Sequence, residues 1–193
     1  MRLLPILALS LVIVASPGAG QAQEEAAFSP QEVMNGLAVD ALWSAADDFF
    51  HSGDHRRVAL LNLTATYLDP YFVQAYLDAA YILWSNDRHE QAVALYLRAA
   101  KANPDNADIW EELGDYYLIN RRNYQKAIEA FSEAARRPHQ GYQIEKNLAH
   151  CYEKSGMLQE ALDIWLELHR QHPEDGVVSS NLKRLQSALS TKV

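Results

Sequence analysis

The stretch that decides the fold reads Trp110-Glu-Glu-Leu-Gly-Asp-Tyr-Tyr117, followed after a short gap by Ala127-Ile-Glu-Ala-Phe131. Its large apolar residues recur at the spacing of one face of an α-helix. Gly114 and Ala127 place a small residue on each segment, where two backbones can approach closely. The stretch therefore predicts two helices that pack against each other as a pair.

The same marks recur along most of the chain. The prolines are spaced by 34, 34 and 35 residues, at Pro70, Pro104, Pro138 and Pro173. Small residues keep the same step at Ala46, Ala80, Gly114 and Ala149, and large apolar residues follow them at Phe49, Leu83, Tyr117 and Tyr152. Further series run Val58, Ala92, Ala127, Ala161 and then Tyr96, Phe131, Trp165. Since one helix pair cannot bury its apolar face alone, the period predicts pairs stacked side by side. The slip from 34 to 35 places one extra residue in the segment 119–124.

These motifs resemble the tetratricopeptide repeat, and the resemblance covers residues 39–175 as four units, 39–72, 73–106, 107–141 and 142–175. It implies an all-α fold, a right-handed α-solenoid of four helix pairs. The third unit, residues 107–141, matches the pattern of the tetratricopeptide repeat best. The first unit departs from the pattern, because Asn62 stands where a large apolar residue is usual and Val58 replaces a small one.

Both ends of the array have the marks of capping elements. Ser29-Pro30-Gln31-Glu32 predicts a helix start, with a serine cap, a proline in the first turn and a glutamate that reaches back. We expect residues 23–38 to form a linker and a capping helix from about Pro30, broken near Gly36. Residues 176–193 predict an amphipathic closing helix, with apolar positions at Val178, Leu182, Leu185 and Leu189.

The first 22 residues have the three parts of a secretory signal. Arg2 supplies the positive start, residues 3–15 are uncharged and largely apolar, and small residues lead to a predicted cut after Ala22. We therefore expect a periplasmic or secreted protein. An uncleaved N-terminal anchor is the alternative, and it would be the chain's sole attachment to a membrane.

Composition argues against several classes of function. The net charge of −8 has the wrong sign for a nucleic-acid backbone binder. The single cysteine, Cys151, forms no intrachain disulfide and no cysteine-rich zinc site. The chain has no Gly-rich phosphate loop and no nucleophile elbow, and its closely spaced histidines have no third metal ligand nearby. We therefore expect no enzyme, no cofactor and no metal.

The family resemblance implies that the first helix of each unit lines a concave groove. The lining positions that we select carry aromatic, apolar or charged side chains: Asp40, Trp43, Asp47, Phe50, Leu77, Tyr81, Trp84, Asp108, Glu111, Asp115, Leu118, Lys146, His150 and, on the closing helix, Arg184. Five of these are carboxylates in the first three units, whereas Lys146, His150 and Arg184 reverse the sign at the far end. Exposed aromatic patches usually mark contact surfaces.

The groove suggests a scaffold or assembly factor of the cell envelope that binds a peptide or protein segment with basic and apolar residues. Two readings compete at the level of the residues. The aromatic side chains could pack on the N-terminal helix or on each other, and the carboxylates could form only a solvated face. Two competing functions also stay open, a repeat protein that self-associates as a homo-oligomer, and an accessory protein that stacks sugars on Trp and Tyr.

Overall fold

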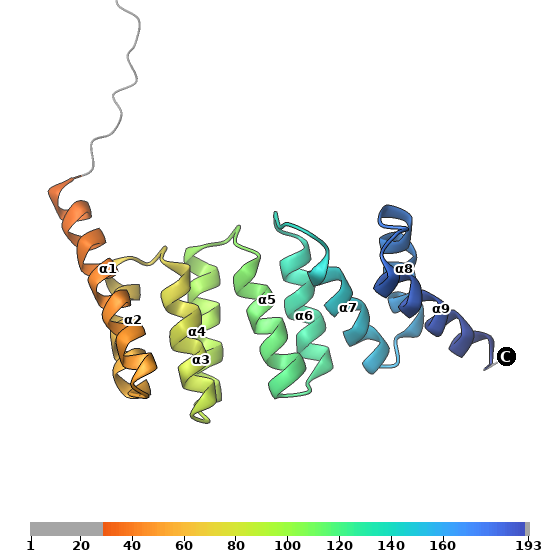
Figure 1. Ribbon diagram of the computed structural model, residues 1–193, viewed down its shortest axis with the longest axis horizontal. Helices are drawn as coiled ribbons and strands as arrows, with labels where there is room; N and C mark the ends of the chain where they lie inside the picture. Colours follow the sequence, from red (N-terminus) through yellow and green to blue (C-terminus); the bar gives the residue numbers. More distant parts are fainter. Residues whose placement is uncertain (1–28, 192–193) are drawn as a thin grey trace, which may run out of the picture.

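The computed structural model describes residues 29–191, which form a row of helices along the long axis of the molecule (Figure 1). In chain order, the α-helices and one π-helical segment are α1 Pro30–His51, α2 His55–Leu68, α3 Val73–Ser85, α4 His89–Ala102, α5 Asp108–Asp115, η1 Tyr116–Asn120, α6 Tyr124–Ala135, α7 Gln143–Lys154, α8 Leu158–Gln171 and α9 Gly176–Ser190. No strand occurs within this range. The structure confirms the predicted all-α solenoid.

Successive helices form the predicted pairs. α1 packs on α2, α3 on α4, α5 on α6 and α7 on α8, and each pair also contacts the next. The apolar cores interlock, since one cluster joins α3, α4 and α5 and the following cluster joins α5, α6 and α7. Each unit is therefore stabilised by its neighbours, as stacking of helix pairs requires.

Aromatic side chains on the second helices fill the space beside the small residues. Tyr96, Phe131 and Trp165 are all at most 2% exposed. A Cβ on Gly114 would lie 2.7 Å from the Phe131 ring, so the third unit requires glycine at that place. The small residues of the first helices therefore leave the space in which the aromatic rings of the second helices pack.

The extra residue of the third unit lies in the turn between its two helices. The Asn123 backbone N–H donates to the Tyr117 carbonyl, six residues earlier, at 2.9 Å. In the other units the equivalent bonds span five residues, Asp54 to Phe49, Arg88 to Leu83 and Met157 to Tyr152. The chain absorbs the insertion by widening its last turn into the π-helical segment Tyr116–Asn120.

The N-terminal helix differs from the expectation in one respect. The predicted capping box is present, with Ser29 and Glu32 bonding each other's backbone N–H. The predicted break near Gly36 is wrong, because α1 runs without interruption from Pro30 to His51. A single glycine lowers helix propensity without ending a helix whose other residues favour it. The capping helix and the first helix of the first unit are thus one element.

The closing helix is α9. The Asp175 carboxylate caps it by accepting from the backbone N–H groups of Val177 and Val178. Val178, Leu182 and Leu185 are buried against α8, and Trp165 belongs to the same cluster. Over residues 29–191, no helix has the length and apolar character to cross a membrane. The predicted signal, residues 1–22, lies outside the described residues.

Candidate functional site

The predicted groove residues lie on the first helices of the units and on α9, and none of them is buried. Side-chain hydrogen bonds join these helices across the units. Trp43 on α1 donates to Asp78 on α3, and Asn147 on α7 donates to Asp115 on α5. The first helices therefore border one another directly, as a shared binding face requires.

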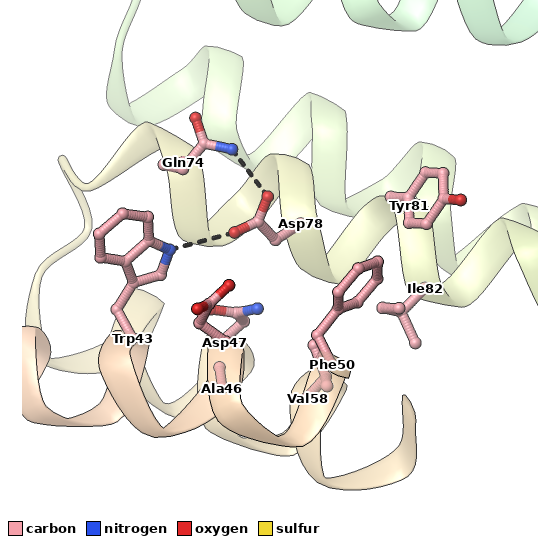
Figure 2. Close-up of a pocket in the computed structure, with 10 residues that line it drawn as sticks. Trp43, Ala46, Asp47, Phe50, Val58, Gln74, Asp78, Tyr81 and Ile82 are labelled. Atoms are coloured by element: carbon pink, nitrogen blue, oxygen red, sulfur yellow. Dashed lines mark hydrogen bonds between the residues drawn. The ribbon is translucent and has the colours of Figure 1, made fainter. Parts of the chain in front are cut away.

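The N-terminal part of this face is hollowed. A pocket of about 310 Å³ opens between α1, α2 and α3 (Figure 2). Four of the predicted residues line it: Trp43, Asp47, Phe50 and Tyr81. The other lining residues were not selected from the sequence: Ala46, Val58, Asn62, Gln74, Asp78 and Ile82. The ring of aromatic side chains and the carboxylates share one concavity, so apolar and charged groups of a ligand can be bound together there.

A hydrogen-bonded triad forms one wall of the pocket. The Trp43 indole N–H donates to Asp78 Oδ2 at 3.1 Å, and the Gln74 amide donates to Asp78 Oδ1 at 2.7 Å (Figure 2). Asp78 was missed because the selected lining positions lie before and after it on α3. Its signal in the sequence was a carboxylate one helical turn from Gln74.

The pocket exists because the first unit lacks its aromatic filler. Asn62 takes the place that Tyr96, Phe131 and Trp165 occupy in the other units. It is 1% exposed, and its Oδ1 accepts no hydrogen bond from any described residue. An asparagine side chain is much smaller than an aromatic ring, so space remains above Ala46 where Phe131 covers Gly114 in the third unit.

The exposed aromatic surface is narrower than expected. Trp43, Phe50 and Tyr81 are each more than 40% exposed, and all of them line the pocket. By contrast, Leu77 and Trp84 are half-buried against the core cluster of α3, α4 and α5. Leu118 is likewise half-buried, against the cluster of α5, α6 and α7. The exposed aromatic character of the face is therefore concentrated in the first two units.

The middle of the face is acidic. Burial, followed by repulsion from Glu112 and Glu111, raises the pKa of Asp115 to about 6. Burial also raises the pKa values of Glu111 and Glu112, with Asp108 as the next cause for both. Burial and mutual repulsion thus both disfavour the ionised forms of Asp115, Glu111 and Glu112, and a cation bound beside these carboxylates would offset that repulsion.

The C-terminal end is less basic than expected. The Arg184 guanidinium lies 2.7 Å from Glu153 Oε2, and Glu153 also accepts from the indole of the buried Trp165. Burial lowers the pKa of His150, which favours its neutral form. The charge of Arg184 is therefore compensated by Glu153, a residue that is not among the selected groove residues. The Lys146 ammonium lies over the Tyr142 ring, 4.8 Å from its centroid.

No group of three or more His, Cys, Asp or Glu side chains in residues 29–191 could hold a metal ion. Cys151 is buried, and burial raises the pKa of its thiol to about 12, so it stays protonated.

This geometry defines an α-helical repeat protein whose first helices carry a hollowed, acidic and aromatic face. The family model for the tetratricopeptide repeat matches residues 77–142 and 117–175, about half of the chain. The chain belongs to the tetratricopeptide repeat family.

Individual proteins are only distantly similar. Tetratricopeptide repeat protein 37 of Xenopus laevis is 23% identical over an alignment of 173 residues, which covers 83% of this chain and 11% of that protein. This chain thus spans a small part of that relative's length.

Two solved structures share the fold. PilW, described as a widely conserved type IV pilus biogenesis factor, is 19% identical over 78% of this chain and 69% of its own, with a TM-score of 0.57. YrrB, described as a protein with an unusual peptide-binding site, is 18% identical over 77% of this chain and 76% of its own, with a TM-score of 0.58.

Proposed function

We propose that this protein is an exported, non-catalytic scaffold that binds a peptide or protein segment on the face formed by its first helices. The tetratricopeptide repeat fold supports a protein–protein interaction scaffold. The observation that carries the proposal is the pocket of about 310 Å³, where exposed aromatic rings and carboxylates meet on one face. Such rings contribute large buried areas on association.

The chemistry of the face favours a segment with basic and apolar residues. The four carboxylates of α5 create a negative potential that attracts cationic ligands and raises their association rate. Trp43, Phe50 and Tyr81 supply apolar area beside them. An acidic segment would be repelled over the first three units.

We place this activity in the cell envelope. The residues 1–22 have the pattern of a secretory signal. PilW, a neighbour in fold, is a pilus biogenesis factor, which is compatible with a scaffold role in envelope assembly. A fusion of residues 1–28 to a reporter that folds only after export tests this location, and a reporter retained in the cytoplasm would overturn it.

Binding is tested with a peptide array probed by the purified chain without residues 1–22. We expect Phe50→Ala and Glu111→Lys each to weaken binding of basic, aromatic-rich peptides by about tenfold, since each removes a central anchor or reverses a charge. Asp163→Lys is the matched control, because Asp163 is an exposed carboxylate on the second helix α8. Equal binding by all variants would refute the groove.

A second candidate, self-association, is favoured by one observation. Val33, Met34 and Leu37 are each at least 50% exposed on the first turns of α1, at the N-terminal end of the described row of helices (Figure 1). A second copy could bury these side chains. Light scattering over a range of concentrations would show a dimer that the substitution Leu37→Glu dissociates. A monomer at all concentrations would exclude self-association.

A further inference from the structure

We infer that the pocket of the first unit binds the side chain of a lysine. This inference rests on the proposed function, since it names the residue of the partner segment that the first unit recognises. It is carried by two observations, the vacant aromatic place above Ala46 and the buried, unpaired side-chain oxygen Oδ1 of Asn62.

The vacancy has the dimensions and walls that suit one long side chain. In the other units the equivalent space is filled from within by Tyr96, Phe131 or Trp165. In the first unit it opens to solvent, with Val58 and Ile82 as apolar floor and wall. A partner's side chain can therefore take the place that the chain's own aromatic residue leaves empty.

The polar groups of the pocket determine the charge of its occupant. Asp47 and Asp78 both line it, and no Lys or Arg does. Among the described residues, two imidazoles adjoin the lining: His51 lies 3.6 Å from Asp47 and is charged only if protonated, and His55 stacks on the Phe50 ring at 5.9 Å. Asp78 accepts from two neutral donors, which leave its negative charge in place. An anionic occupant would be repelled, and an apolar one would desolvate two carboxylates without compensation.

A buried acceptor also requires a donor. Asn62 Oδ1 is enclosed and unpaired, which costs free energy unless a ligand donates to it. A lysine ammonium carries three donors on a slender stem, enough for Asn62 and a carboxylate together. Its methylenes can lie against Trp43 and Phe50, whose ring faces also attract a cation.

An arginine fits these acceptors less well. Its planar fork is suited to a carboxylate with two open oxygens. Both oxygens of Asp78 already accept a hydrogen bond, from Trp43 and from Gln74. At Asp78 the compact ammonium is therefore the better match.

The first experiment follows the Trp43 indole N–H by NMR in the ¹⁵N-labelled chain without residues 1–22. This group donates to Asp78 in the pocket wall, so its resonance reports on the pocket. The probes are Nα-acetyl-lysine methylamide, its norleucine analogue and its arginine analogue. We expect saturable shifts with lysine and at least about tenfold weaker binding for the other two. Equal binding of norleucine overturns the inference, and equal binding of arginine overturns the choice of an ammonium.

The second experiment refills the vacancy. Asn62→Phe restores the aromatic filler of the other units, and we expect it to abolish the lysine-induced shift while the thermal midpoint rises. Asp47→Asn is expected to weaken lysine binding by about tenfold and to keep the fold, because Asp47 is exposed. Asp48→Asn, one residue away and outside the pocket, is the matched control. Folded variants Asn62→Phe and Asp47→Asn that bind lysine like the wild type would overturn the inference.

The peptide array separates this inference from the proposed function. Peptides that bind the wild type and Asn62→Phe equally, without preference for lysine, support the groove and refute the lysine pocket. A lysine probe that binds at Trp43 while no peptide on the array is captured refutes the groove and supports the pocket.

Discussion

At the scale of single residues, the contact between a small side chain and an aromatic ring decides the local packing. Gly114 accommodates the Phe131 ring so closely that even a methyl group would overlap with it. In the first unit the partner of Ala46 is Asn62, and a pocket replaces the contact. One substitution in a repeat therefore converts a core contact into a pocket that opens to solvent.

Alanine at two glycines should have opposite effects on stability. Gly114→Ala is expected to lower the free energy of unfolding by about 1–2 kcal/mol, because overpacking against Phe131 outweighs the gain in helix propensity. Gly36→Ala is the control at a position without steric conflict, since no atom lies within 4 Å of where the alanine Cβ would be. It is expected to raise the free energy by up to about 1 kcal/mol. Urea unfolding measures both, and a loss of stability at Gly36 would contradict the argument.

Asp115 should make the protein more stable in mild acid. Its folded pKa of about 6 lies above its unfolded value, so the ionised form is destabilising, and stability rises as the pH falls through 6. Asp115→Asn removes this penalty and keeps an acceptor for Asn147. We expect a higher thermal midpoint than the wild type at about pH 7.5 and the same midpoint at about pH 3, below both pKa values. An unchanged midpoint at the higher pH would contradict the assignment.

At the scale of elements, the turn between paired helices is a repeated structure. The residue before each second-helix cap has a positive φ, at Gly53, Asp87, Arg122 and Gly156. Glycine adopts this conformation at little cost, whereas other L-residues are disfavoured there. The third unit keeps the same turn despite its extra residue, because the π-helical segment Tyr116–Asn120 takes up the insertion.

Glycine should therefore improve the turn of the third unit. Arg122 is exposed and has a φ of 48°, so Arg122→Gly relieves the left-handed strain. The gain is about 0.5–1 kcal/mol after the entropy cost of glycine, or about 1–4 °C in thermal midpoint. Arg121→Gly is the neighbouring control, since Arg121 has a φ of −106°. A midpoint raised by both substitutions alike would point to charge removal as the cause.

At the scale of the whole molecule, each helix pair depends on its neighbours for burial. The cores form a chain of clusters, and α9 covers the last one, around Trp165. In such an array a local defect destabilises the adjacent units more than distant ones.

A defect in the closing helix should open the C-terminal end first. Leu182→Ala removes a buried side chain from the α8–α9 cluster and is expected to cost about 2–4 kcal/mol. Hydrogen exchange by mass spectrometry should then show faster exchange over α7, α8 and α9, with little change over α1 and α2. Uniformly faster exchange along the chain would show instead that the array unfolds as one unit.

The amino-acid sequence by itself determined the repeat, the helix pairs and the closing helix, because these follow from the spacing of apolar, small and capping residues along one segment. From the sequence we also selected Trp43, Asp47, Phe50 and Tyr81, which line the pocket, and noted that Asn62 departs from the repeat pattern. The tertiary structure alone decided which side chains meet across units. The Trp43–Asp78 and Glu153–Arg184 contacts join residues more than thirty positions apart, and the stacking of the helices brings them within hydrogen-bond distance. The pocket is likewise tertiary, since an empty volume belongs to the three helices that enclose it and to no single segment.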